Sequence, residues 1–237
     1  MDALPYRNRH IVVTGGTGAL GTAVVGALLG AGAICHVPCR TEGELQSFAH
    51  RDHPNIVMAP GTDLTAEVAV TALYEGLPTL WASIHLAGGF AAAPIETIDR
   101  AALMQQLETN LISAFLCCRA AVMAMKRTQG EGGRIVNVAA RPALEWRGGA
   151  NMLAYAASKA AVAAFTVGLA EEVADDGILV NAVAPSIMDT PANRKAMPKA
   201  DHAAWPKVDE VAQTILFLAS PDNAVTRGAI IPVYGRT

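Results

Sequence analysis

A glycine-rich turn after the first apolar run most strongly constrains the fold of this chain. The run His10–Thr14 leads into the segment GGTGALG at 15–21, and an alanine-rich stretch follows it. Gly16, Gly18 and Gly21 have the GxGxxG spacing, in which glycine permits a tight turn and lets the backbone approach a pyrophosphate. A following helix would add unpaired N–H groups and a favourable dipole. The same pattern also suits a close-packed turn that binds nothing, so its surroundings matter.

Apolar runs of strand length alternate with longer helical stretches along the chain. The runs are continuously apolar, as in parallel strands that are covered on both faces. This rhythm predicts an α/β fold: a single-domain, Rossmann-type, doubly wound parallel sheet of about seven strands with helices on both faces, over residues 1–237. The expected strands are His10–Thr14, Ala33–Cys39, Asn55–Ala59, Ala82–Ala87, Arg134–Val138, Ile178–Ala184 and Ala229–Val233. The expected helices are Ala19–Leu29, Ala66–Tyr74, Ala101–Lys126, Met152–Ala174 and Asp209–Leu218.

One stretch, 186–206, departs from this rhythm. It follows the sixth expected strand and contains Pro191, Pro198 and Pro206, which predict irregular structure. A long irregular segment in a compact domain is usually functional. Ligands of open α/β sheets bind beyond the carboxyl ends of the strands, where this segment would lie. We therefore expect a substrate lid at about 186–206, anchored by burial of Trp205.

The charge balance and the cysteines exclude several classes of function. The formal net charge of −3 offers no broad attraction to nucleic acid or to an anionic membrane surface. No apolar run spans a bilayer without glycine or polar interruption, and residues 1–10 lack the apolar core of a signal peptide. The cysteines form no CxxC pair and have no histidine cluster nearby, so we expect no metal site, and His85 is expected to be structural. A cytoplasmic protein is predicted.

The end of the second expected strand indicates which nicotinamide dinucleotide would fit the turn. A carboxylate there would accept a hydrogen bond from the 2′-hydroxyl of the adenosine ribose. This strand instead ends in Cys39 and Arg40, and Arg40 could pair with a 2′-phosphate. We therefore expect NADP(H) to be favoured over NAD(H), unless Arg40 is only a solvated surface charge. Asp63, after the third strand, could accept a hydrogen bond from the adenine amino group or cap the turn at Thr65.

A tyrosine and a lysine lie near the start of the long helical stretch Met152–Ala174. Tyr155 and Lys159 are four residues apart, so they share one face of a helix. A free phenol has a pKa of about 10 and exchanges its proton reluctantly at neutral pH. A neighbouring ammonium stabilises the phenolate, so we expect Lys159 to lower the pKa of Tyr155. The same lysine could hydrogen-bond the nicotinamide ribose.

Together these features resemble the short-chain dehydrogenase/reductase family over nearly the whole chain. The matching pieces are the TGGTGALG loop, Asp63-Leu64, Ala87-Gly88-Gly89, Asn110 in TNLIS, Tyr155-x-x-x-Lys159, and Pro185 with Thr190. The resemblance implies that Tyr155 exchanges a proton with a small-molecule substrate, that Lys159 assists it, and that Asn110 supports a water relay. Asn110 could alternatively satisfy helix backbone groups. The expected cofactor-binding residues are Gly15, Thr17, Gly18, Ala19, Leu20, Gly21, Arg40, Asp63, Leu64, Ala87, Gly88, Gly89, Val138, Tyr155, Lys159, Pro185, Ile187 and Thr190.

The sequence departs from the family pattern after the fifth expected strand. The family usually has a serine there that donates to the substrate carbonyl, whereas this chain has Ala139 and Ala140. Where a reaction depends on such a donor, its loss costs about 2.7–4 kcal/mol of transition-state stabilisation. Ala19 and Leu86 likewise stand where the family usually has glycine and asparagine.

These departures leave three hypotheses. Quinonoid dihydropteridine reductases share these departures and resemble the chain over DTPANRKAMP at 189–198. That branch, however, has an acidic residue after its second strand, where this chain has Cys39 and Arg40. An electron-poor pterin ring gains aromatic stabilisation on hydride capture, which lessens its need for a donor. A catalytically silent dinucleotide-binding sensor is also compatible with the missing serine. The leading hypothesis is an NAD(P)H-dependent oxidoreductase that transfers hydride to a small carbonyl or ring imine, with Tyr155 as proton donor.

Two alanine-rich helical stretches and a low charge content indicate self-association. Charged residues make up 16% of the chain, below the average for soluble domains. The stretches Ala101–Lys126 and Met152–Ala174 have wide apolar faces. In the family that the chain resembles, these two helices form the dimer interface. A homodimer or homotetramer is therefore expected.

Overall fold

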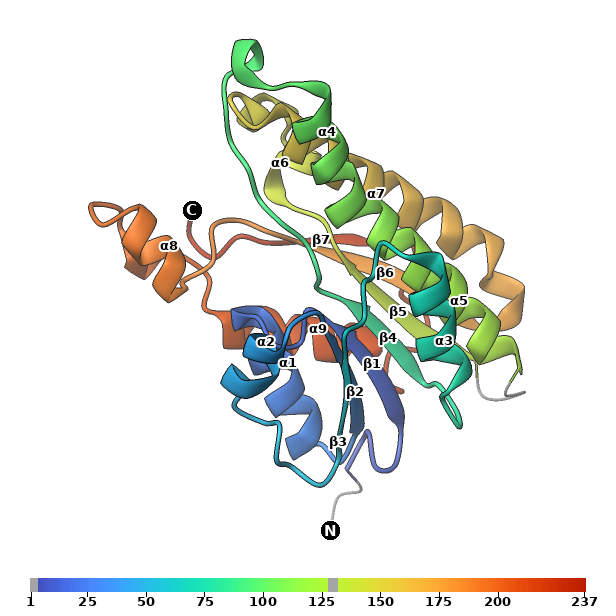
Figure 1. Ribbon diagram of the computed structural model, residues 1–237. Helices are drawn as coiled ribbons and strands as arrows, with labels where there is room; N and C mark the ends of the chain where they lie inside the picture. Colours follow the sequence, from blue (N-terminus) through green and yellow to red (C-terminus); the bar gives the residue numbers. More distant parts are fainter. Residues whose placement is uncertain (1–3, 128–131) are drawn as a thin grey trace.

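Seven parallel strands form one sheet in the computed structural model, which describes residues 4–127 and 132–237. They are β1 His10–Thr14, β2 Ile34–Cys39, β3 Ile56–Pro60, β4 Ala82–His85, β5 Gly133–Val138, β6 Ile178–Pro185 and β7 Ile230–Val233. Their order across the sheet is β3-β2-β1-β4-β5-β6-β7 (Figure 1). Each expected strand is present, with its ends close to the predicted residues.

The order of strands reverses between β1 and β4. β2 and β3 extend the sheet on one side of β1, and β4 to β7 extend it on the other. In open parallel sheets the crevice at such a switch point, beyond the carboxyl ends of the strands, is where ligands bind. The glycine turn directly follows β1 and therefore lies at this crevice.

Helices cover both faces of the sheet, as expected. α1 and α9 pack together on one face, while α3, α5 and α7 cover the other (Figure 1). The alternation within β1 matches this arrangement, because Ile11 and Val13 join the core under α1 and α9 whereas Val12 faces α3 and α5. The helices are α1 Ala19–Gly30, α2 Glu42–Ser47, α3 Glu67–Glu75, α4 Arg100–Leu107, α5 Ser113–Arg127, α6 Arg141–Leu144, α7 Leu153–Glu172, α8 Pro191–Ala196 and α9 Val208–Ala219.

The stretch expected as one helix over Ala101–Lys126 has three parts. α4 ends at Leu107, one π-helical turn spans Glu108–Ile112, and α5 begins at Ser113. The wider turn carries Asn110 and changes the direction in which its side chain leaves the helix. Such insertions are frequent at functional sites. Hydrophobic periodicity does not resolve a single wide turn, so the sequence did not predict it.

Two helical stretches, Arg100–Arg127 and Leu153–Glu172, are long and apolar enough to cross a membrane by length and composition alone. The expectation from sequence was that no apolar run is long enough without glycine or polar interruption, and both stretches contain such residues. In the structure, α5 and α7 both pack against the sheet through part of their surface.

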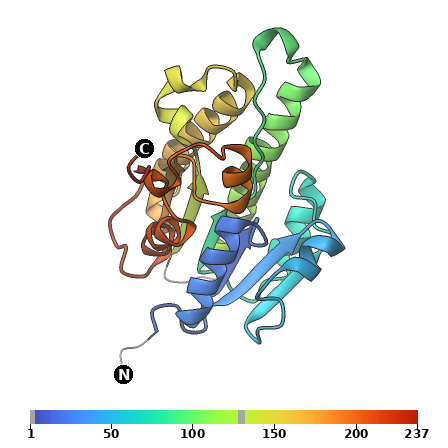
Figure 2. The same ribbon diagram turned by 90° about the vertical axis from the view of Figure 1, so that its left-hand side faces the viewer.

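The 186–206 segment lies beyond the carboxyl end of β6 and projects from the body of the domain (Figure 1). Its expected irregularity is wrong in part, because Pro191 begins the helix α8. Proline suits the first position of a helix, where its missing N–H has no partner to lose. Trp205 is 6% exposed, as expected for an anchor. The C-terminal residues run beside this segment (Figure 2), and Arg236 N donates to the Ala204 carbonyl at 2.9 Å.

A chain of buried hydrogen bonds crosses the sheet at β4 and β5. The Tyr74 hydroxyl lies 2.7 Å from Ser83 Oγ, which lies 2.8 Å from His85 Nε2. His85 Nδ1 is 2.8 Å from Asn137 Oδ1, so this nitrogen donates. Asn137 Nδ2 then donates to Thr166 Oγ1 on α7 at 3.0 Å. The network ties α3, β4, β5 and α7 together, which is the structural role expected for His85.

Acidification is expected to weaken the fold through His85. Burial lowers the pKa of His85 to about 4, whereas an unfolded histidine titrates near 6.5. The unfolded chain therefore binds more protons between these values, and the stability present above pH 6.5 is lost as the pH falls toward 4. Between pH 7 and pH 5 this single group should cost about 2 kcal/mol in the free energy of unfolding. Urea unfolding at the two pH values measures it.

The matched variants for this test are His85→Asn and His53→Asn. His53 is exposed, so its replacement should leave the pH dependence unchanged. His85→Asn should be less stable at pH 7 and should lose less stability on going to pH 5. An unaltered pH dependence in His85→Asn would show that another group is responsible.

Candidate active site

The turn after β1 needs glycine for two separate reasons. Gly15 has a φ of +65°, a conformation that L side chains rarely adopt, and a Cβ on it would lie 2.7 Å from the backbone nitrogen of Ala87. A Cβ on Gly21 would overlap the carbonyl oxygen of Gly15. Gly18 precedes α1 without a capping side chain, so the first N–H groups of the helix are not taken by one. Bare backbone beside a helix N-terminus fits the pyrophosphate of a dinucleotide.

A cleft of about 270 Å³ lies at the carboxyl ends of β1, β2, β3 and β4. The wall residues expected from the sequence are Gly15, Thr17, Gly18, Arg40, Asp63, Leu64, Ala87 and Gly88. The wall residues that were not expected are Pro38, Cys39, Glu44, Thr62, Thr65, Leu86, Thr109 and Ser113. Ala19, Leu20 and Gly21 form the first turn of α1 beside it. The fold thus gathers the residues expected around the phosphate and adenosine groups.

Glu44 is the charged wall residue that sequence reasoning missed. A signal for it was present, because Thr41-x-x-Glu44 is a capping-box pattern that predicts a helix start. α2 begins at Glu42, and Thr41 Oγ1 accepts a hydrogen bond from Glu44 N at 3.2 Å. The helix is short and polar, so it has no apolar periodicity to reveal it.

The structure shows one of the two roles that the sequence left open for Asp63, the turn cap. Its Oδ1 accepts hydrogen bonds from N and Oγ1 of Thr65 at 2.9 and 2.8 Å, which makes it a turn cap. These two bonds, with a smaller contribution from the charge of Arg40, lower the pKa of Asp63. Because Asp63 also lines the cleft, capping does not remove it from the ligand side.

Lys159 and Asn110 meet beside Gly88 in the wall of the cleft. Lys159 is buried, and its Nζ donates to the carbonyl oxygen of Val138 at 2.8 Å. A Cβ on Gly88 would lie 2.7 Å from Asn110 Oδ1 and 3.3 Å from Lys159 Nζ, so both polar groups reach this part of the backbone. Burial lowers the pKa of Lys159 to about 8. A buried cation therefore lies next to an amide behind Gly88, although neither Lys159 nor Asn110 itself lines the cleft.

Asn110 bonds the loop after β4 and not the backbone of its own helix. Its Oδ1 accepts from Gly89 N at 2.9 Å, and its Nδ2 donates to Gly89 O and to Ser158 Oγ, both at 3.0 Å. Ser158, which sequence reasoning missed, donates in turn to the Tyr155 carbonyl at 2.8 Å. The π-helical turn thus connects Asn110 with the start of α7.

Tyr155 does not have the lowered pKa that was expected from its lysine neighbour. It lies one turn before Lys159 on α7, and its ring meets Phe90 edge-on with centroids 5.0 Å apart. Burial raises the pKa of Tyr155 to about 12. The shift comes from removing the phenolate from water, and the Lys159 ammonium does not contribute to it.

The two alanines after β5 are buried and differ in surroundings. Ala139 packs in a small apolar cluster, whereas Ala140 precedes α6 and gives it no side-chain cap. The next residue, Arg141, forms an ion pair with Glu145 at 2.7 Å, and its guanidinium lies over the ring of Tyr234. Neither alanine can donate a hydrogen bond where the family usually has serine.

The residues expected over the nicotinamide lie at the end of β6 and in the 186–206 segment. Pro185 ends the strand, Ile187 is exposed, and Thr190 is buried as the cap of α8. They are not among the residues that line the 270 Å³ cleft.

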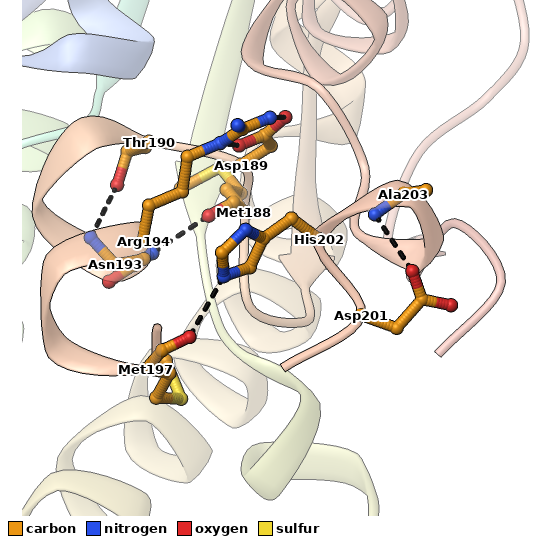
Figure 3. A network of polar contacts seen from close by, with 9 residues as sticks. All are labelled: Met188, Asp189, Thr190, Asn193, Arg194, Met197, Asp201, His202 and Ala203. Carbon is orange, nitrogen blue, oxygen red and sulfur yellow. Dashed lines mark hydrogen bonds and ion pairs between the residues drawn. The ribbon is translucent and has the colours of Figure 1, made fainter. Parts of the chain in front are cut away.

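Polar contacts within the 186–206 segment hold its shape (Figure 3). The Arg194 guanidinium pairs with both carboxylate oxygens of Asp189, and His202 Nε2 lies 2.8 Å from the Met197 carbonyl. The His202 ring also contacts Trp205, with centroids 4.6 Å apart. His202 and Arg194 are thus engaged within the segment itself.

A larger hollow, about 410 Å³, lies between α3 and α5, away from the strand ends. Glu67 and Arg119 form an ion pair in its wall. None of the site residues expected from the sequence lines it. The glycine turn lines the smaller cleft instead, and the Tyr155–Lys159 pair lines neither hollow.

Known proteins match this chain over nearly its whole length. The family model described as short chain dehydrogenase matches residues 9–201. The cis-4-hydroxycyclohexanecarboxylate dehydrogenase of Sinomonas cyclohexanicum is 34% identical, over 97% of this chain and 96% of the relative. The crystal structure of gox2181 is 27% identical, with a TM-score of 0.89 over 98% of this chain and 96% of that one. ElxO with NADP bound is 23% identical, with a TM-score of 0.86 over 96% of this chain and 98% of that one, and shares the fold. The chain therefore belongs to the short-chain dehydrogenase family of NAD(P)-dependent oxidoreductases.

Proposed function

We propose that this enzyme reduces a small carbonyl or ring imine with NADPH and that Tyr155 donates the proton. The observation that carries the proposal is the meeting of Lys159 Nζ and Asn110 Oδ1 at Gly88, in the wall of the glycine cleft and one helical turn from Tyr155. The relative from Sinomonas cyclohexanicum is named for a ring hydroxy acid, which supports a small carbonyl as the oxidised substrate.

Each of these residues has a distinct role in the proposal. The bound dinucleotide supplies the hydride. Tyr155 gives its phenolic proton to the substrate oxygen or nitrogen as negative charge develops there. Lys159 stabilises the resulting phenolate, binds the nicotinamide ribose and passes a proton back to Tyr155. Water held by Asn110 then returns a proton to the lysine.

We propose NADP(H) as the favoured cofactor, because Arg40 is an exposed cation in the wall of the cleft directly after β2. The test of the whole proposal is oxidation of NADPH in the presence of small cyclic ketones, cyclic imines or a quinonoid dihydropterin. NADPH oxidation that depends on any of these substrates supports the proposed reductase. Dinucleotide binding without turnover of any of them would favour the alternative of a silent sensor.

A quinonoid pterin remains the second candidate substrate, because Ala139 and Ala140 cannot donate to a carbonyl. We expect Ala140→Ser to raise kcat/KM for small ketones by at least about tenfold, since one such donor is worth 10²–10³-fold in other enzymes. A serine before α6 can also accept a cap hydrogen bond from the helix, so the fold tolerates it. Ketone kinetics on the purified variant measure the gain.

Ala139→Ser is the matched control, because it adds the same hydroxyl one residue earlier, inside an apolar cluster. It should give no gain. If Ala140→Ser reduced no ketone faster than the wild type does, and its activity on quinonoid pterin were unchanged, a pterin would be favoured over a carbonyl compound as the substrate.

We propose further that residues 1–237 act as one catalytic domain and that 186–206 serves as a substrate lid over Tyr155. Self-association through α4, α5 and α7 as a homodimer or homotetramer is supported by exposed apolar side chains on these helices, Leu103, Phe115, Met123, Leu153 and Val167. Four buried free cysteines suit a reducing compartment, so we propose the cytoplasm. The proposal includes no nucleic-acid or membrane partner.

A further inference from the structure

Two opposite charges stand together at the end of β2. Arg40 follows the strand directly, and Glu44 lies in α2; both are wall residues of the glycine cleft. Glu44 Oε2 accepts a hydrogen bond from the backbone nitrogen of Arg40 at 2.8 Å. The carboxylate is therefore held against a residue that itself lines the cleft.

Local structure fixes the position of Glu44. Thr41 caps α2 through its bond to Glu44 N, and the Glu44 side chain folds back to the backbone before the cap. Each of these contacts satisfies a backbone N–H group at the start of α2. Glu44 is half-buried, whereas Glu42, two residues earlier on the same short helix, is exposed and does not line the cleft.

The carboxylates around Arg40 act on their neighbours. Burial first, and then the charges of Glu44 and Glu42, raise the pKa of the Cys39 thiol. On the other side of the cleft, Asp63 is close enough to Arg40 for their charges to interact. The positive charge that would attract a phosphate is thus surrounded by negative ones.

We propose that Glu44 is a second cofactor-specificity residue, which opposes Arg40 and keeps the preference for NADP(H) over NAD(H) small. The inference rests on the proposed dinucleotide function. In Rossmann folds the 2′ group of the adenosine ribose lies at the end of the second strand, where a carboxylate accepts from the 2′-hydroxyl and an arginine pairs with the 2′-phosphate. This chain has both groups in one wall, so each form of the cofactor meets one favourable partner.

The test compares two fragments of the cofactors, 5′-AMP and 2′,5′-ADP, which differ only in the 2′-phosphate. Isothermal titration calorimetry gives their dissociation constants for the wild type, Glu44→Gln and Glu42→Gln. Glutamine keeps an oxygen acceptor for Arg40 N, so the local structure is preserved while the charge is removed. We expect Glu44→Gln to bind 2′,5′-ADP about fivefold more tightly, with 5′-AMP changed by less than about twofold, as for a partly exposed charge beside a dianion.

Glu42→Gln changes the net charge by the same amount on the same helix, but Glu42 does not line the cleft, so the gain for 2′,5′-ADP should be clearly smaller than in Glu44→Gln. An equal gain in Glu42→Gln would assign the effect to overall charge and overturn the proposal. So would a Glu44→Gln variant that binds 2′,5′-ADP no better, or that shifts both nucleotides alike. If the wild type bound neither nucleotide, the dinucleotide function itself would fall, and this inference with it.

Discussion

Tyr155→Phe is expected to lower kcat by about 10²–10⁴-fold, because it removes the hydroxyl that delivers the proton. Phenylalanine keeps the edge-on contact with Phe90, whose centroid is 5.0 Å away, so the local packing is retained. Burial holds the pKa of Tyr155 at about 12, and the phenol is therefore protonated and ready to donate at neutral pH. Steady-state oxidation of NADPH measures kcat, and fluorescence titration with NADPH measures binding, which should change by less than about twofold.

Tyr234→Phe is the matched control. It removes another phenol from the carboxyl edge of the sheet, just after β7, where the ring stacks with Arg141. This variant should keep most of the wild-type kcat. If Tyr155→Phe instead kept more than about a tenth of the activity, a different group would have to be the proton donor.

Gly21→Ala is expected to remove dinucleotide binding and to destabilise the fold. The new Cβ would overlap the carbonyl oxygen of Gly15, and this backbone atom cannot move without changing the turn. Overpacking against fixed atoms costs about 3 kcal/mol. A displaced turn also loses its alignment with the pyrophosphate, so we expect NADPH to bind at least about 100-fold more weakly. Thermal unfolding and NADPH titration measure the two effects.

Gly30→Ala, at the other end of α1, tests the same substitution where space is available. A Cβ on Gly30 meets nothing within 4 Å. Alanine there should raise the free energy of unfolding by about 0.5 kcal/mol, because it restricts the unfolded chain and favours helix, and binding should not change. A Gly21→Ala variant that bound NADPH like the wild type would contradict the assignment of the glycine turn as the phosphate site.

Local patterns were sufficient to predict the elements that carry strong periodicity. The seven strands and the long helices were expected close to where they lie, because each repeats an apolar pattern over many residues. Short elements without such a pattern were missed. α2 is polar and six residues long, and α8 begins at a proline that was taken as a sign of irregular structure.

Residue roles were harder to predict than elements. The sequence supplied Tyr155, Lys159 and Asn110 as candidates through a family resemblance, and the structure gathers Lys159 and Asn110 at Gly88. It did not supply Glu44, which reaches the cleft only because α2 turns back beside β2.

The sequence by itself determined the succession of strands and helices along the chain, the glycine turn, and the spacing of Tyr155 and Lys159. These features depend on residues only a few positions apart. Only the tertiary structure decided the ionisation of the site. Lys159 Nζ bonds Val138, and Asn110 bonds Gly89 and Ser158, through contacts between segments distant in the chain. Desolvation depends on what packs around a group, and packing of distant segments is what raises the pKa of Tyr155 and lowers that of Lys159.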